Sequence, residues 1–252
     1  CDEAYLEASR NFIANLTRQM ADKNFLYCET STHPHYMGTT DIDYNAAAKK
    51  AYDAWRKDNT GAPLFPATFP IRDTFLKNKH WNRFRAERLA AWINGEIAAL
   101  RENSSDKNIW IAVDYFDNGE GNQRRLGDAQ VFLNSLGDLQ IMQVYWNRHH
   151  PALKLDDKAY GAVYKVMKEK NVSWAVTESN SLGFEPLTPK ETEACMKSTI
   201  RHGTQFGWEF HSVDPGLPTS QYDADWNPRA NMAVVDKQWD KWLKEIEKAL
   251  KR

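Results

Sequence analysis

Several acidic and histidine side chains of this chain stand at the ends of short apolar runs. Glu178 is the last residue of the run 173–178 (SWAVTE), and Asp114 lies near the end of the run 109–116 (IWIAVDYF). His33 follows a third apolar run after a short gap. Carboxylates and imidazoles can transfer protons, attack as nucleophiles or bind metal ions. These three residues are therefore the first candidates for chemistry.

The chain is also rich in aromatic side chains, which make up 12% of its 252 residues and include 10 Trp. Tyr145, Trp146 and Trp208 stand in or beside apolar runs. Sugar rings present flat apolar faces that stack on indole and phenol rings, so this richness favours a carbohydrate ligand. Many of the Trp are equally expected to fill the core or cover helix faces.

Five apolar runs have the length of buried strands, and helical patterns alternate with them. The runs are 24–31, 109–116, 139–146, 173–178 and 205–213. The predicted helices cover 4–20, 44–57, 83–102, 156–170, 190–202 and 236–251. This alternation predicts an α/β fold with a parallel sheet and right-handed crossovers. Because chemistry in α/β barrels sits at the carboxyl ends of the strands, we expect the polar residues after the runs to meet at one rim.

Composition and charge narrow the class of partner. A hydrophobic content of 42% suffices for a sizeable core, and the formal net charge of -1 provides no field that attracts nucleic acid or an anionic membrane. No window approaches the roughly 20 continuous apolar residues that cross a bilayer. Neither a repeat nor a linker divides the sequence, so we predict one domain over residues 1–252.

The three cysteines, Cys1, Cys28 and Cys195, allow at most one internal disulfide and show no metal-ligand spacing. Cys1 could be the lipidated first residue of a bacterial lipoprotein. This possibility favours a secreted, periplasmic or lipoprotein location over a cytoplasmic one.

The sequence resembles a known family in several places. The segment 173–180 (SWAVTESN) is similar to the seventh strand of the (β/α)8-barrel glycoside hydrolases whose two catalytic glutamates lie on strands four and seven. The segment 188–210, which ends in GWEF, resembles their last helix and eighth strand, and Tyr145-Trp146 resembles the end of their sixth strand. The resemblance covers most of the chain from about residue 8 onward. It implies a TIM-type barrel of the cellulase or β-galactosidase kind.

The resemblance also implies roles for individual residues. Glu178 would be the nucleophile of a retaining hydrolase acting on β-linked oligo- or polysaccharide, in which a second carboxyl about 5 Å away protonates the leaving oxygen. The sugar contacts would come from residues at the ends of several strands. These are Tyr145, Trp146, Trp208, Asp114 and His211.

The sequence departs from the family at the second catalytic residue. Members carry an Asn-Glu-Pro motif after strand four, where this chain has Thr32, His33 and Pro34. An imidazole with a reference pKa near 6.5 can donate a proton, so His33 is the predicted general acid and base. Glu29 is a poor substitute because four strand residues separate it from His33 by about 13 Å. Asp114 is the other candidate acid.

Two further readings stay open. The replacement by His33 is compatible with a barrel that has lost activity and binds glycan through Trp146 and Trp208. His33 and His35 also have the spacing of metal ligands in barrel metallohydrolases. Such a site could be completed by His149, His150, Glu178, His211 and Asp214. The favoured reading needs neither a metal nor a cofactor.

The number of strands is also smaller than in the family. A closed barrel of this type has eight strands, and the sequence predicts five, the first of which resembles strand four. Five parallel strands would leave two open edges and an exposed apolar lumen. We therefore predict that the first three β/α units are missing, and that a companion chain or an N-terminal segment completes the barrel. The alternative is an unrecognised strand, for example in 60–72.

Overall fold

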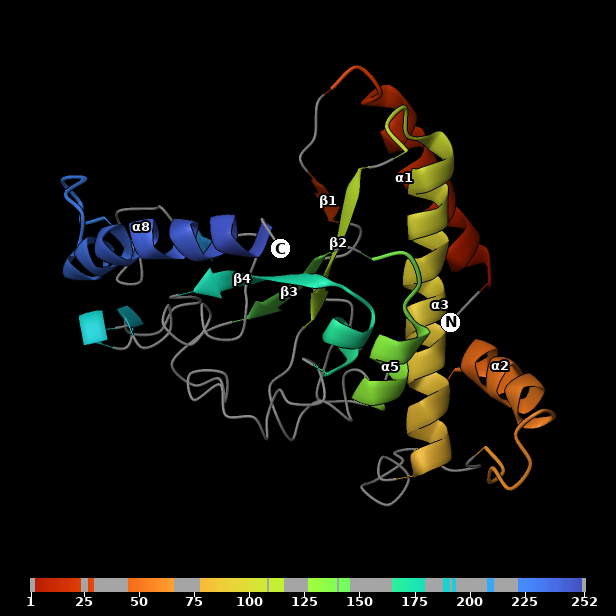
Figure 1. Cartoon of the computed structure of the whole chain (residues 1–252). Helices are drawn as coiled ribbons and strands as arrows, with labels where there is room; N and C mark the ends of the chain where they lie inside the picture. The colour runs from red at the N-terminus through yellow and green to blue at the C-terminus, as the bar shows by residue number, and fades with distance from the viewer. Residues whose placement is uncertain are drawn as a thin grey trace. The chain divides into compact units, whose positions relative to one another are not determined.

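The structure is a computed structural model of the chain (Figure 1). It describes residues 3–23, 27–29, 45–65, 78–107, 109–115, 127–139, 141–145, 165–179, 188–190, 192–193, 208–210 and 222–250. The chain forms two compact units. The first unit comprises Cys1–Phe116 and Glu120–Gln140, and the second comprises Asp117–Gly119 and Ile141–Arg252.

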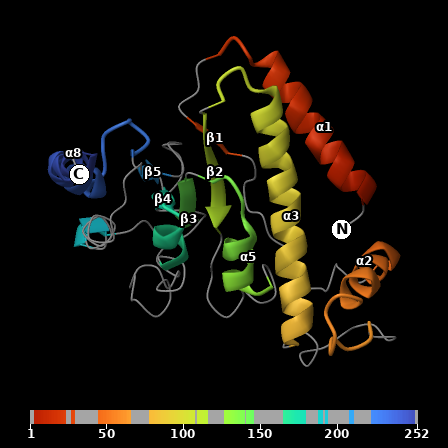
Figure 2. The same cartoon turned by 45° about the vertical axis from the view of Figure 1, so that its right-hand side comes forward.

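The described part of the first unit contains a parallel strand pair and four helices (Figure 2). Its elements are α1 (Glu3–Gln19), β1 (Tyr27–Glu29), α2 (Ala46–Arg56), α3 (Lys79–Asn103), β2 (Trp110–Tyr115) and α5 (Ala129–Ser135). Strand β1 pairs in parallel with β2, and Glu29 lies level with Ala112. Helix α3 contacts both α1 and α5. Because it has neighbours on more than one side, α3 buries residues around most of its circumference, from Trp81 to Leu100.

Aromatic side chains of α2 pack against aromatic side chains at the start of α3. Tyr52 of α2 is completely buried, and its ring centroid lies 5.1 Å from those of both Trp81 and Phe84. Trp55 and Phe65 pack against the same cluster. The edge-to-face contacts of Tyr52 with Trp81 and Phe84 are the geometry that aromatic pairs prefer. Tyr52 and Trp81 are therefore packed in the core of the first unit and are not available to a sugar.

The interface between α1 and α3 contains a buried carboxyl group. Glu96 is only 4% exposed, and one of its oxygens, Oε1, accepts a hydrogen bond from the Ser9 hydroxyl. Trp92 Nε1 in turn donates to Ser9 Oγ at 3.0 Å. The other oxygen, Glu96 Oε2, is buried and has no hydrogen-bond partner among the described residues. Burial raises the pKa of Glu96 above its ordinary value of 4.5, and the hydrogen bonds from Ser9 and Trp92 oppose part of that rise.

Glu96 should therefore make stability depend on pH. Because its pKa is higher in the folded than in the unfolded chain, its contribution is complete below about pH 4.5 and is lost as the pH rises through the folded-state pKa. We expect Glu96→Gln to remove this decline. The free energy of unfolding, measured by urea titration from about pH 4.5 to 8, should fall less with rising pH in the variant. An identical pH slope in the two proteins would contradict this account.

Helix α5 is anchored to α3 through the residues just before it. Gly127 has a φ of 75°, and a Cβ atom on it would lie 2.3 Å from the Asn82 carbonyl oxygen. The next residue, Asp128, donates its backbone N–H to that oxygen at 3.0 Å. The Asp128 side chain accepts from Val131 N at 3.0 Å and so caps α5. Only glycine permits this close approach.

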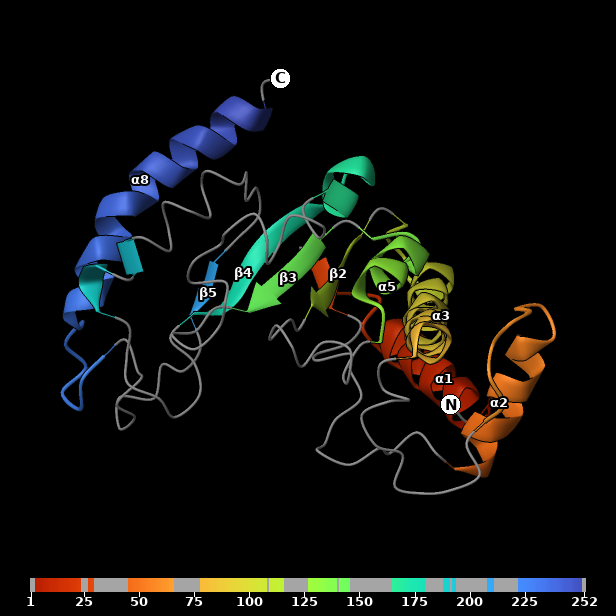
Figure 3. The same cartoon turned by 90° about the horizontal axis from the view of Figure 1, so that it is seen from below.

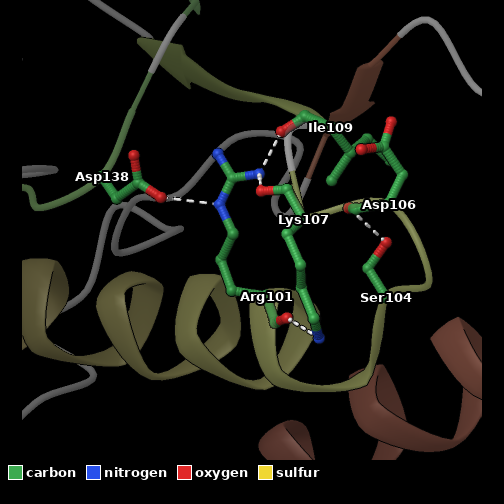
Figure 4. A network of polar contacts seen from close by, with 6 residues as sticks. All are labelled: Arg101, Ser104, Asp106, Lys107, Ile109 and Asp138. Atoms are coloured by element: carbon green, nitrogen blue, oxygen red, sulfur yellow. Dashed lines mark hydrogen bonds and ion pairs between the residues drawn. The ribbon is translucent and has the colours of Figure 1, made fainter.

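A network around Arg101 connects the end of α3 to β2 (Figure 4). Arg101 Nε donates to Asp138 Oδ2 at 2.6 Å, and Nη1 donates to the carbonyls of Lys107, at 3.0 Å, and Ile109. Lys107 Nζ donates back to the Arg101 and Glu102 carbonyls at 2.8 and 3.0 Å. A cation thus satisfies the last carbonyls of α3, as helix ends require. The network sets where β2 begins.

The described part of the second unit contains three parallel strands and a long helix (Figure 3), and residues 165–169 are also helical. Its elements are β3 (Ile141–Tyr145), β4 (Ser173–Ser179), β5 (Trp208–Phe210) and α8 (Ala230–Leu250). Strand β4 pairs in parallel with both β3 and β5. Helix α8 runs in the opposite direction to β3 and β4, as a β/α crossover requires (Figures 1 and 3).

Within the described residues, the predicted elements agree with the structure except at two helices, and most of the predicted helices 156–170 and 190–202 lies outside those residues. Parallel pairing is confirmed in both units. Helix α8 begins at Ala230, six residues before the predicted start at 236. Asp236 is thus an internal residue of the helix. Helix α5 was not predicted. Its seven residues are too few to show a helical period, and its signal is the single cap Asp128.

None of the helices in the described ranges combines the length and the apolarity needed to cross a bilayer.

Candidate functional site

The strongest candidate, Glu178, lies near the carboxyl end of the central strand of the second unit. It is the penultimate residue of β4, which extends from Ser173 to Ser179. On one side, Tyr145 at the end of β3 lies level with Thr177. Glu178 therefore stands one residue beyond the last β3–β4 pair. This is the edge of a parallel sheet at which α/β proteins place their chemistry.

On its other side, β4 is irregular at the candidate residue. Val176 pairs with Trp208 and Ser179 with Phe210, so three steps along β4 correspond to two steps along β5. The extra residue lies in the segment of Thr177 and Glu178. An extra residue of this kind is a β-bulge, which bends the strand and is over-represented beside active sites. Sequence reasoning missed the bulge, because it is a property of the pairing of two strands and has no glycine to mark it.

The register brings three candidates onto adjacent strands. Tyr145 belongs to β3, Glu178 to β4 and Trp208 to β5. Neighbouring strands lie about 4.8 Å apart, so the backbones of these residues span roughly 10 Å across the sheet. That span is small enough for one ligand to meet all three strands.

A second carboxyl-bearing residue stands opposite the bulge. Glu209 lies on β5 between Trp208 and Phe210, the two residues that pair with β4 on either side of Glu178. The sequence places Glu209 next to Trp208 on the expected rim, although it assigns no chemical role to this residue. Its only signal was its place between two aromatic residues of an apolar run.

Asp114 occupies the equivalent place on a strand of the first unit. It is the penultimate residue of β2, two residues beyond Ala112, which pairs with the last residue of β1. Asp114 thus stands at a carboxyl end of a parallel strand, as predicted. None of the other residues predicted for the site lies among the described residues of that unit.

The remaining predicted site residues lie outside the described residues. They are His33, Trp146 and His211, together with His35, His149, His150 and Asp214 of the metal alternative. Within the ranges that the structure describes, no group of three His, Cys, Asp or Glu side chains is arranged to hold a metal ion.

The first unit contains a cavity of about 260 Å³ at the carboxyl ends of α1 and α3. Apolar side chains line much of it, among them Ile13, Leu16, Leu100 and Ile109, and the half-buried thiol of Cys28 also reaches it. Ile109 directly precedes β2, so the cavity lies toward the amino end of that strand. In β/α folds this end serves stability and the opposite end serves chemistry. The cavity thus lies toward the end of β2 opposite to that of Asp114.

Comparison with known proteins adds information on the fold. No protein-family model matches the chain, and no curated protein is similar to it in sequence. Among solved structures it is similar to the glycoside hydrolase domain of PgaB (BpsB) from Bordetella bronchiseptica, with 10% identity over 81% of this chain and a TM-score of 0.50. It is also similar to a hyperthermophilic endocellulase from Pyrococcus horikoshii, with 14% identity over 92% of this chain and a TM-score of 0.52.

At such low identity these similarities show a glycoside-hydrolase-like fold and nothing finer. The chain spans 57% of the PgaB domain and 62% of the endocellulase.

Proposed function

We propose that this chain forms the catalytic part of a retaining glycoside hydrolase that acts on β-linked oligo- or polysaccharide. One observation carries the proposal: Glu178 stands at the carboxyl end of β4, in a bulge, between the strands of Tyr145 and Trp208. The fold likeness to a glycoside hydrolase domain and to an endocellulase supports the choice of carbohydrate. In this proposal Glu178 is the nucleophile and His33 the acid and base.

The proposed reaction has two steps. In the first, the Glu178 carboxylate forms a bond to the anomeric carbon while the glycosidic C–O bond breaks, and the His33 imidazolium donates its proton to the departing oxygen. In the second, neutral His33 takes a proton from water as that water attacks the anomeric carbon. The bond to Glu178 breaks as the water attacks, and both residues return to their starting states. Aromatic rings of Tyr145, Trp146 and Trp208 hold the sugar, and Asp114 and His211 bind its hydroxyls.

The role of His33 predicts a dependence on the leaving group. Removal of a general acid slows cleavage most where the departing oxygen needs a proton. We expect His33→Ala to lower kcat/KM for natural oligosaccharides by about 10²–10⁴-fold and to change it little for dinitrophenyl glycosides, whose leaving group departs as a stable anion. Steady-state kinetics on the two substrate types measure the difference.

Asp114→Asn and Glu209→Gln are the matched controls for this experiment. If His33→Ala slows both substrate types equally, or neither, His33 is not the acid. If instead Asp114→Asn or Glu209→Gln shows the leaving-group dependence, the acid is the corresponding carboxyl. A wild-type chain that binds glycans and cleaves none of them would replace the proposed hydrolase by a glycan-binding barrel.

A further inference from the structure

A tightly hydrogen-bonded turn, residues 222–229, leads into α8. The Trp226 backbone N–H donates to the Asp223 carbonyl at 3.0 Å, and the Asp223 N–H donates to the Asn227 carbonyl, also at 3.0 Å. Tyr222 and Pro228 form an antiparallel bridge that closes the turn. The turn is thus a defined structure and not an open excursion of the chain.

The carboxylate of Asp223 holds the turn from inside. Its Oδ1 accepts from the backbone N–H groups of Asp225 and Asn227 at 2.9 and 2.8 Å, and Asn227 Nδ2 donates to Oδ2 at 3.2 Å. Hydrogen bonds from Asn227, with smaller effects of Asp225 and Arg229, lower the pKa of Asp223. The carboxylate is therefore ionised, and able to accept all these bonds, at neutral pH.

Trp226 adopts an unfavourable conformation at the tip of this turn. Its φ is 63°, in the left-handed region that bulky residues seldom occupy. Its side chain is nevertheless 62% exposed, and its ring centroid lies 6.1 Å from that of Tyr222. Neither burial nor backbone preference explains a Trp here. Backbone strain of this kind persists where the surrounding structure enforces it, and it often marks a functional position.

The turn stands on the catalytic side of the second unit. Helix α8 runs opposite to β3 and β4, so its amino end, where the turn lies, is on the side toward which those strands point (Figures 1 and 3). Glu178 is near the carboxyl end of β4. Trp226 is therefore on the same side of the unit as the proposed nucleophile.

We propose that Trp226 is a sugar-stacking platform that binds one ring of a longer β-linked glycan, beyond the residues that cleave the bond. This inference rests on the proposed function, because it requires a glycan ligand. The polar neighbours favour a sugar over an apolar protein surface: Asp225 and Asn227, which flank Trp226 in the sequence, are exposed, and their side-chain oxygens can accept hydrogen bonds from hydroxyls. A protein-binding anchor would instead lie within a continuous apolar patch.

The test separates binding from bond cleavage. We expect Trp226→Ala to raise the Kd for long β-linked oligosaccharides, measured by calorimetry, by about tenfold. The same variant should leave kcat/KM for an aryl monoglycoside unchanged, because that substrate is too short to reach the platform. Trp239→Ala is the matched control: Trp239 is a 39% exposed Trp of α8, and its removal should change neither quantity.

A second variant excludes unfolding as the cause. Glycine accepts a positive φ without strain, so Trp226→Gly should have a Tm at or above that of the wild type while it loses the same affinity. Oligosaccharide affinity that is unchanged in both Trp226 variants would overturn the platform and leave the proposed hydrolase intact. A wild-type chain that neither binds nor cleaves any β-linked glycan would overturn both.

Discussion

Replacement of Glu178 by Gln is expected to lower kcat on β-linked glycosides by on the order of 10⁴-fold, with little change in the Kd for oligosaccharides. The amide keeps the size of the carboxyl group but cannot attack the anomeric carbon, so the glycosyl-enzyme does not form. Substrate binding depends on aromatic surfaces and hydroxyl contacts that the change leaves in place. Turnover of an aryl glycoside and calorimetric titration with an oligosaccharide measure the two quantities.

The matched control for this variant is Glu169→Gln. Glu169 is an exposed glutamate of the same unit, 3.9 Å from Lys165, and its loss should affect neither turnover nor affinity. Turnover that is unchanged in Glu178→Gln would remove Glu178 from the mechanism. A loss of both turnover and affinity, together with a lower Tm, would make Glu178 a structural residue of the bulge.

Gly127→Ala is expected to destabilise the first unit by about 3 kcal/mol. The new methyl group would have to share space with the Asn82 carbonyl oxygen, which a Cβ at this position meets at 2.3 Å. That oxygen belongs to the backbone of α3, so it cannot move aside as a flexible side chain would. The hydrogen bond from Asp128 to the same oxygen, and with it the start of α5, should be lost as well.

Gly61→Ala separates steric overlap from backbone strain. Gly61 also has a positive φ, 91°, but a Cβ atom there meets nothing within 4 Å. This variant should therefore lower the free energy of unfolding only by the backbone strain, about 1 kcal/mol. Because two units need not unfold together, hydrogen exchange of the amides in α3 and α5 should accompany urea titration. An equal decrease in the free energy of unfolding in the two variants would show that the contact between Gly127 and α3 has no energetic role.

The sequence predicts the helices and strands well where the periodic spacing of apolar residues extends over enough residues to be recognised. The predicted helix 83–102 corresponds to α3, Lys79–Asn103, which starts earlier because Asn78 caps it by accepting from His80 N and Trp81 N. The short helix α5 and the early start of α8 escape such reasoning. They depend on tertiary contacts of a few residues, such as Gly127 with Asn82, and on the absence of any stop signal before Asp236.

The candidate site could be predicted only in part, for a similar reason. Residue types and strand ends identify Glu178 and Asp114, and both are penultimate residues of parallel strands. The bulge at Glu178 and the conformation of Trp226 arise from register and hydrogen bonding, which residue types do not encode. The roles of His33, Trp146 and His211 stay predictions, since these residues lie outside the described ranges.

The completion of the barrel also stays a prediction. The described strands pair in parallel within each unit, as an α/β barrel requires, and the chain spans 57% and 62% of two glycoside-hydrolase structures that it resembles. Both observations are compatible with a barrel whose first three β/α units come from elsewhere.

The covalent role of Glu178 is the central step of the proposed mechanism, and it can be observed directly. A 2-deoxy-2-fluoro glycoside with a good leaving group forms the glycosyl-enzyme but releases it slowly, because the fluorine destabilises the oxocarbenium-like transition state. Mass spectrometry of the digested protein should then find the fluorosugar on the peptide that contains Glu178. A sugar attached to another residue, or no adduct on a protein that turns over the parent glycoside, would contradict the proposed mechanism.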